Sequence, residues 1–124
     1  MKKSAEFFAM RFKEEFNCPN YSYESVEYLS QIIESFRKKV LPNLEKDDHE
    51  FTIFCIEMAC FLGQCIIEHY GGEWDEDELC VVKLHTKNEY VLAYPHQFVL
   101  KQLEFGYEEY DVCAFFKAVS ALLK

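Results

Sequence analysis

The sequence predicts a helix-dominated α+β fold in a single domain that spans residues 1–124. Apolar residues recur at helical spacing through most of the chain, whereas two β-rich runs flank a short polar loop within residues 79–94. A length of 124 residues suits one hydrophobic core. No internal repeat and no linker rich in Pro or Gly divides the chain. The predicted order of elements is αααββαα.

The first two predicted helices are amphipathic. Residues 4–16 carry one apolar face, with Ser4 as the candidate N-cap, and a Pro19 turn separates this helix from the next. The second helix is expected to begin near Ser22 or Ser25 and to end before Pro42. Its apolar face consists of Val26, Leu29, Ile33, Phe36 and Val40.

The third predicted helix, at about residues 50–70, is the central element. Asp47 and Asp48 are its candidate N-caps, and nearly all of its positions are apolar or small. Gly71 and Gly72 follow, where a helix end favours a residue that tolerates positive φ. The polar exceptions fall within roughly 40° on a helical wheel; they are Glu50, Glu57, Gln64 and Glu68.

A β-hairpin and two helices complete the predicted fold. Residues 79–85 and 90–94 are β-rich and enclose a four-residue polar loop, which predicts a hairpin at about 79–94. Pro95 suits the first position of a short helix that Gly106 ends. A last helix, from about Glu109, presents large apolar residues beside three alanines and is expected to close the core.

Composition limits the class of protein. The net charge of −9 argues against a nucleic-acid partner. The apolar stretch at 51–67 contains Glu57 and Gln64, so we expect a core helix and no membrane partner. The N-terminal apolar run at 7–10 is too short for a signal peptide. The six cysteines are therefore expected to be reduced thiols in a cytoplasmic protein.

The cysteine spacing predicts no metal site and no cofactor. Cys55, Cys60 and Cys65 recur every five residues, and a step of five turns roughly 140° around a helix. Their sulfurs therefore point in three directions and cannot converge on one ion. No Cys-x-x-Cys or His-x-x-x-His pair occurs in the chain.

One segment carries a resemblance. Leu62 and Gly63, followed by Glu68 and then Gly71-Gly72-x-Trp74, form a Leu-Gly…Glu-x-x-Gly-Gly-x-Trp pattern. This pattern resembles a signature of small uncharacterised bacterial domains of unknown function. The resemblance implies a bacterial cytosolic domain, of a kind whose relatives are proposed as partners in toxin and immunity systems, so it implies an immunity-like role.

The most charged segment is the acidic run at residues 73–78. Five carboxylates in six residues supply more than half of the net charge of −9. One interpretation is a docking patch for a basic protein, and the other is a solvated loop. Trp74 is expected to fold back over the end of the central helix, or to serve as an anchor if it is exposed. The candidate partner-binding residues are Glu73, Trp74, Asp75, Glu76, Asp77 and Glu78.

A second candidate is a pocket. The polar stripe of Glu57, Gln64 and Glu68 on the central helix either lines a cleft or forms the solvent face of that helix. His96, near a helix N-terminus and one turn from Lys101, is a candidate anion site or an ordinary surface residue.

These features favour a non-catalytic protein-interaction module that presents an acidic surface to a basic partner. One alternative is a small enzyme or ligand-binding domain that uses the polar stripe. Another is a homo-oligomeric structural subunit; short of that, we expect a monomer or a weak homodimer. The aromatic residues that would suit an oligomer face are Tyr21, Tyr23, Tyr107 and Tyr110.

Overall fold

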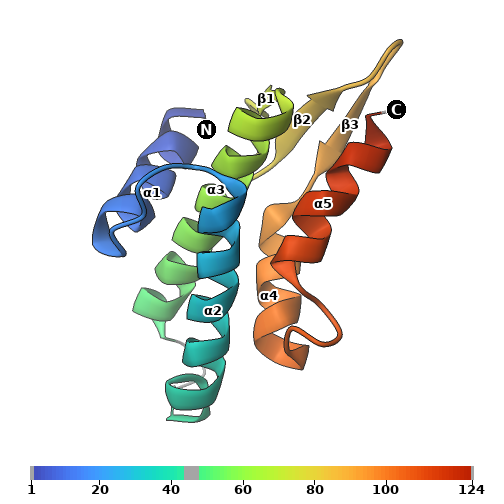
Figure 1. The fold of residues 1–124 in the computed structure, drawn as a ribbon. Helices are drawn as coiled ribbons and strands as arrows, with labels where there is room; N and C mark the ends of the chain where they lie inside the picture. Colours follow the sequence, from blue (N-terminus) through green and yellow to red (C-terminus); the bar gives the residue numbers. More distant parts are fainter. Residues whose placement is uncertain (1, 44–47, 124) are drawn as a thin grey trace.

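The computed structural model describes residues 2–43 and 48–123 and confirms the predicted α+β class (Figure 1). Within these ranges, five α-helices precede and follow a small antiparallel sheet in the order αααβββαα. The helices are α1 (Lys2–Glu15), α2 (Tyr23–Lys39), α3 (His49–Tyr70), α4 (Pro95–Phe105) and α5 (Val112–Leu122), with a 3-10 turn η1 (Leu41–Asn43) after α2. The strands are β1 (Glu73–Trp74), β2 (Val82–His85) and β3 (Tyr90–Ala93).

Helix α3 is the central element, as predicted (Figure 1). It packs most extensively against α1 and α4, and it also contacts α2, α5 and strand β2. Every residue from Met58 to Gly63 is buried. Among the described residues, α3 alone is long and apolar enough to span a membrane, but more than half of its most apolar window is buried within the fold. The structure thus places it as a core helix, as the sequence predicted.

The helix ends follow the predicted caps at most positions. The Asp48 side chain accepts a hydrogen bond of 2.9 Å from the Phe51 amide at the start of α3, whereas Asp47 lies outside the described residues. Ser22 caps α2 in the same way. Two expected starts are wrong: α1 already includes Ser4, and α5 begins at Val112, where Asp111 supplies the cap.

The sheet contains one strand more than the sequence predicted. Strands β2 and β3 form the expected hairpin, with Val82 opposite Ala93 and His85 opposite Tyr90. Strand β1 adds to the free edge of β2, with Trp74 opposite Val82. A strand of two residues at the start of an acidic run shows no alternating pattern, so nothing in the sequence indicated it.

Trp74 joins this sheet to α3. Its side chain is only 3% exposed, and its indole Nε1 donates a hydrogen bond of 2.9 Å to the Gln64 side-chain oxygen. A Cβ atom at Gly63 would lie 2.8 Å from Cζ3 of this indole. Gly71 and Gly72 then turn the chain with φ of 84° and 100°, and a Cβ at Gly72 would lie 2.7 Å from the Lys83 carbonyl oxygen. These close approaches explain why glycine occupies positions 63 and 72.

Gln102 joins α4 to α2 and α5 from a fully buried position. Its amide nitrogen lies 3.0 Å from the Ser30 hydroxyl and 3.0 Å from a Glu34 carboxylate oxygen. Its amide oxygen accepts a hydrogen bond of 2.9 Å from the Val112 amide at the start of α5. Asp111 accepts from Ser30 at 3.1 Å and completes the network. The buried amide is thus satisfied at both ends.

Substituting Gly63→Ala tests the contact between α3 and Trp74. Helix propensity alone predicts a stabilisation of about 1 kcal/mol, because glycine is a poor helix former. The overlap with the indole predicts instead a loss of about 1–3 kcal/mol in the free energy of unfolding. We expect urea denaturation to show this loss in the wild-type background. In a Trp74→Phe background, where the outer ring of the indole is absent, Gly63→Ala should cause a smaller loss. A stabilised Gly63→Ala protein would contradict the packing.

Substituting Gln102→Leu is expected to lower the free energy of unfolding by about 1–3 kcal/mol, because the Val112 amide and the Ser30 hydroxyl lose a buried partner. Urea denaturation measures this loss. Gln97→Leu on the exposed face of the same helix is the matched control and should change stability by less than about 0.5 kcal/mol. Equal effects of the two changes would show that the network contributes nothing.

Candidate functional site: an acidic pocket between α1, α2 and α3

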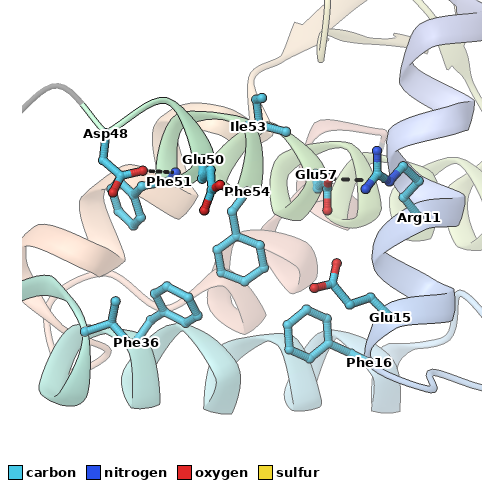
Figure 2. A pocket seen from close by; sticks show the side chains of 11 residues that line it. Arg11, Glu15, Phe16, Phe36, Asp48, Glu50, Phe51, Ile53, Phe54 and Glu57 are labelled. Carbon is cyan, nitrogen blue, oxygen red and sulfur yellow. Dashed lines mark hydrogen bonds and ion pairs between the residues drawn. The ribbon is translucent and has the colours of Figure 1, made fainter. Parts of the chain in front are cut away.

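A pocket of about 550 Å³ opens where α1, α2 and the first half of α3 meet (Figure 2). Its volume lies within the range of small-ligand sites. Five of its residues are carboxylates or an arginine, and the other six are apolar. The lining residues are Arg11, Glu15, Phe16, Phe36, Val40, Asp48, Glu50, Phe51, Ile53, Phe54 and Glu57.

Aromatic rings form the floor of the pocket. Phe54 from α3 lies between Phe36 of α2, with ring centroids 4.4 Å apart, and Phe16 just after α1, at 5.6 Å. Phe51 lies beside Phe36, with ring centroids 6.3 Å apart. Because each ring comes from a different element, or from a different turn of α3, they hold one another in place. The floor is apolar and offers ring faces to a ligand.

Glu57 marks the inner end of the pocket. Its side chain is only 5% exposed, and its nearest cation is the Arg11 guanidinium, whose Nε lies 3.8 Å from a carboxylate oxygen. That separation is too long for a hydrogen bond. Arg11 is 54% exposed and also lies over the Phe7 ring, 5.8 Å from its centroid. The carboxylate of Glu15, one turn along α1, projects into the same space (Figure 2).

The electrostatics of this end are unbalanced. Burial raises the pKa of Glu57 above its ordinary value, the nearby Arg11 lowers it, and the negative charge of Glu15 raises it again. The direction of the sum is upward, so the charged form of Glu57 is less well stabilised here than in water. A cation between Glu57 and Glu15 would restore that stabilisation.

The outer end of the pocket is also acidic. Glu50 projects from the first turn of α3, and Asp48 lies beside it with its side chain bound to the Phe51 amide. Within the part of the chain that the structure describes, the lining therefore carries four carboxylates and one guanidinium. The pocket combines an aromatic floor with a negative rim, which suits a ligand that has an apolar body and a positive group.

The predicted polar stripe of α3 divides among three environments. Glu57 lies in the pocket because α1 covers it, and Gln64 is bound to Trp74. Glu68 is exposed on another face, beside Lys13 and His69. The structure therefore does not bring Gln64 or Glu68 to Glu57. A helix wheel shows angular position but not which neighbouring elements cover each turn.

His96 and Lys101 lie on α4, away from the pocket. The Lys101 ammonium lies over the rings of Tyr110 and Phe98, at 5.2 Å and 5.9 Å from their centroids. Burial lowers the pKa of His96, which favours its neutral form at pH 7. A neutral imidazole supplies no charge to an anion. An anion site at this pair stays a prediction, with Lys101 as its charged member.

The acidic run is only partly free to meet a partner. Trp74 is buried, and the Glu73 carboxylate lies 3.1 Å from His85 Nε2 across the sheet. Asp75 accepts hydrogen bonds from the amides of Asp77 and Glu78 at 3.1 Å and 3.0 Å and so holds the turn. The exposed carboxylates without such a structural role in the run are those of Glu76, Asp77 and Glu78.

Of the four tyrosines expected at an oligomer face, two pack on rings of the core. Tyr21 packs on Phe61, with ring centroids 5.5 Å apart, and Tyr23 packs on Phe116 at 5.6 Å. Tyr107 is exposed, in the connection between α4 and α5. Two of the four residues therefore cover the core.

Sequence reasoning missed Arg11 and Glu15. The two residues are one turn apart on the face of α1 that borders its buried stripe of Ala5, Ala9 and Phe12. That spacing places them on one side of the helix, but nothing in it shows that Glu57 lies opposite. Their convergence depends on how α1 crosses α3.

Comparison of the chain with known protein families, with curated proteins and with solved structures gave no match. Within residues 2–43 and 48–123, no group of three His, Cys, Asp or Glu side chains is arranged to hold a metal ion.

The environment of Glu57 predicts a pH-dependent stability difference between the wild type and Glu57→Gln. Because the folded-state pKa lies above the ordinary 4.5, the unfolded chain loses its proton first as pH rises. The wild type therefore loses stability above about pH 4.5, until pH exceeds the folded-state pKa, whereas the variant lacks this loss. Urea denaturation between about pH 3 and pH 8 should show that the free energy of unfolding of Glu57→Gln increases, relative to that of the wild type, as pH rises. A difference that stays constant or falls would contradict the assigned environment.

Proposed function

We propose that the protein is a non-catalytic interaction domain that holds a basic segment of a partner protein in the pocket between α1, α2 and α3. The observation that carries the proposal is the lining of this pocket, in which an aromatic floor is rimmed by four carboxylates and one arginine. The sequence analysis also favoured a basic partner protein. We now propose that this partner binds at the pocket rather than at the acidic run.

The pocket offers a ligand both apolar contact and electrostatic attraction. Phe36, Phe51 and Phe54 offer apolar and ring surface to the stem of a lysine or arginine side chain. The carboxylates of Glu15, Glu50 and Glu57 select a cation and reject an acidic segment. The net charge of −9 would also speed the approach of a basic partner.

The chemistry of the lining favours binding over catalysis. Among the described residues, the eleven that line the pocket offer no side-chain nucleophile other than carboxylate. The predicted stripe that would have supplied several polar groups from α3 contributes only Glu50 and Glu57 here. We therefore prefer the interaction module to the small enzyme.

Location and biological role belong to the same proposal. All six cysteines are free thiols, which suits a reducing cytoplasm. An immunity-like role, which the Gly-Gly-x-Trp segment suggested by resemblance, would supply a basic toxin as the partner. The pocket then offers such a toxin a defined anchoring point.

A labelled peptide of alternating lysine and leucine residues tests the proposal. We expect the wild type to bind it, as measured by fluorescence polarisation at about 0.15 M salt, and a peptide with glutamate in place of lysine to bind at least tenfold more weakly. The triple variant Glu15→Gln, Glu50→Gln, Glu57→Gln is expected to weaken binding of the lysine peptide at least about tenfold, because each charged hydrogen bond contributes about 1.5–3 kcal/mol.

The matched control removes the same three charges from the acidic run, with Glu76→Gln, Asp77→Asn and Glu78→Gln. At this salt, charges beyond about 8 Å are largely screened, so the control should change the affinity less than twofold. A larger loss in the control would return the partner site to the acidic run. Equal losses, or no binding by the wild type, would overturn the pocket as the site.

A further inference from the structure

We infer that the inner end of the pocket is a cation-exchange site, in which Arg11 occupies the Glu57 carboxylate until an ammonium or guanidinium group of the ligand displaces it. This inference rests on the proposed function and names the group that the pocket recognises. It assigns Glu57 as the anchor, Glu15 as the second carboxylate and Arg11 as an internal competitor.

The first support is the geometry of Glu57. The Glu57 side chain is only 5% exposed, which removes much of the water from its carboxylate, and strong ion pairs place N and O about 2.7–2.9 Å apart. Arg11 approaches only to 3.8 Å, through Nε, and Glu57 makes no hydrogen bond within the described residues. A ligand cation that reaches the carboxylate directly would gain hydrogen bonds that Arg11 does not make.

The second support is the direction in which the neighbouring carboxylate points. Glu15 and Glu57 come from different helices and project into the same part of the pocket (Figure 2). Like charges that converge on one space repel unless a cation lies between them. Arg11 stands to one side of that space, so the position between the two carboxylates is open to a ligand.

The third support is the ease with which Arg11 can leave. Its side chain is 54% exposed, and its guanidinium also lies over the exposed Phe7 ring, 5.8 Å from the ring centroid. Because the Arg11 side chain is already half in water, its guanidinium regains hydration when it leaves Glu57. The aromatic floor beside Glu57 then receives the apolar stem that carries the ligand's charge.

The inference is tested with 4-phenylbutylamine, which joins a ring to an ammonium group, and with its neutral counterpart 4-phenylbutanol. Binding is followed by NMR titration of the wild type and of Arg11→Gln, Lys13→Gln and Glu57→Gln. Lys13 lies on the other side of α1, over the Tyr21 ring at 5.5 Å, so its loss removes the same charge without opening the site. Binding of the neutral probe to each variant shows that the pocket is intact.

We expect Arg11→Gln to tighten binding of the amine about two- to fivefold, because the variant no longer supplies a half-exposed cation that competes for Glu57. Lys13→Gln should tighten it less than twofold, and Glu57→Gln should weaken it at least about tenfold. Phenylbutanol should bind all four proteins with similar affinity.

The outcomes separate this inference from the proposed function. If the lysine peptide binds in the pocket but Arg11→Gln leaves the affinity for the amine unchanged or lowers it, Arg11 is not a competitor and the exchange is overturned alone. Equal tightening by Lys13→Gln would also overturn it, because a general charge effect would then suffice. If neither the peptide nor the amine binds, both are overturned.

Discussion

The rest of the structure depends on the burial of α3. A 22-residue helix with so few polar positions needs cover on almost all sides, and α1, α2, α4, α5 and the sheet each provide part of it. Burial also explains the candidate site. α1 encloses Glu57, whereas towards the start of α3 the rings of Phe36 and Phe54 line the pocket. The pocket is thus a consequence of how the core helix is covered.

The Leu-Gly…Gly-Gly-x-Trp segment acquires a physical meaning from this packing. Gly63 leaves room for the indole of Trp74, Gln64 accepts its hydrogen bond, and Gly72 allows β2 to approach. These residues hold the sheet against α3, and none of them lines the pocket. A sequence that shares the segment is therefore expected to share this junction, while its binding properties are decided by other residues.

Much of the fold was predictable because its signals are local. The caps Ser22 and Asp48, the glycine ends and the apolar spacing lie within a few residues of the elements they define. Strand β1 was not predictable, since its two residues are too few to show an alternating pattern. The site was predictable only at Glu57 and Glu50. Arg11 and Glu15 join them through the crossing of α1 over α3, and a one-dimensional pattern does not record a crossing.

Gln102 and Glu57 are both buried polar side chains, but they differ in how the free-energy cost of leaving water is offset. Gln102 is fully enclosed and bonded at both ends of its amide, so it fixes α2, α4 and α5 to one another. Glu57 is almost as enclosed but holds its nearest cation at 3.8 Å without a hydrogen bond. If Glu57 had only a structural role, we would expect a direct hydrogen bond to its carboxylate, like the hydrogen bonds that Gln102 makes. A mostly enclosed side chain whose carboxylate has only this distant ion pair, and which lies beside an aromatic floor, fits a group that is completed by a ligand, at some expense in stability.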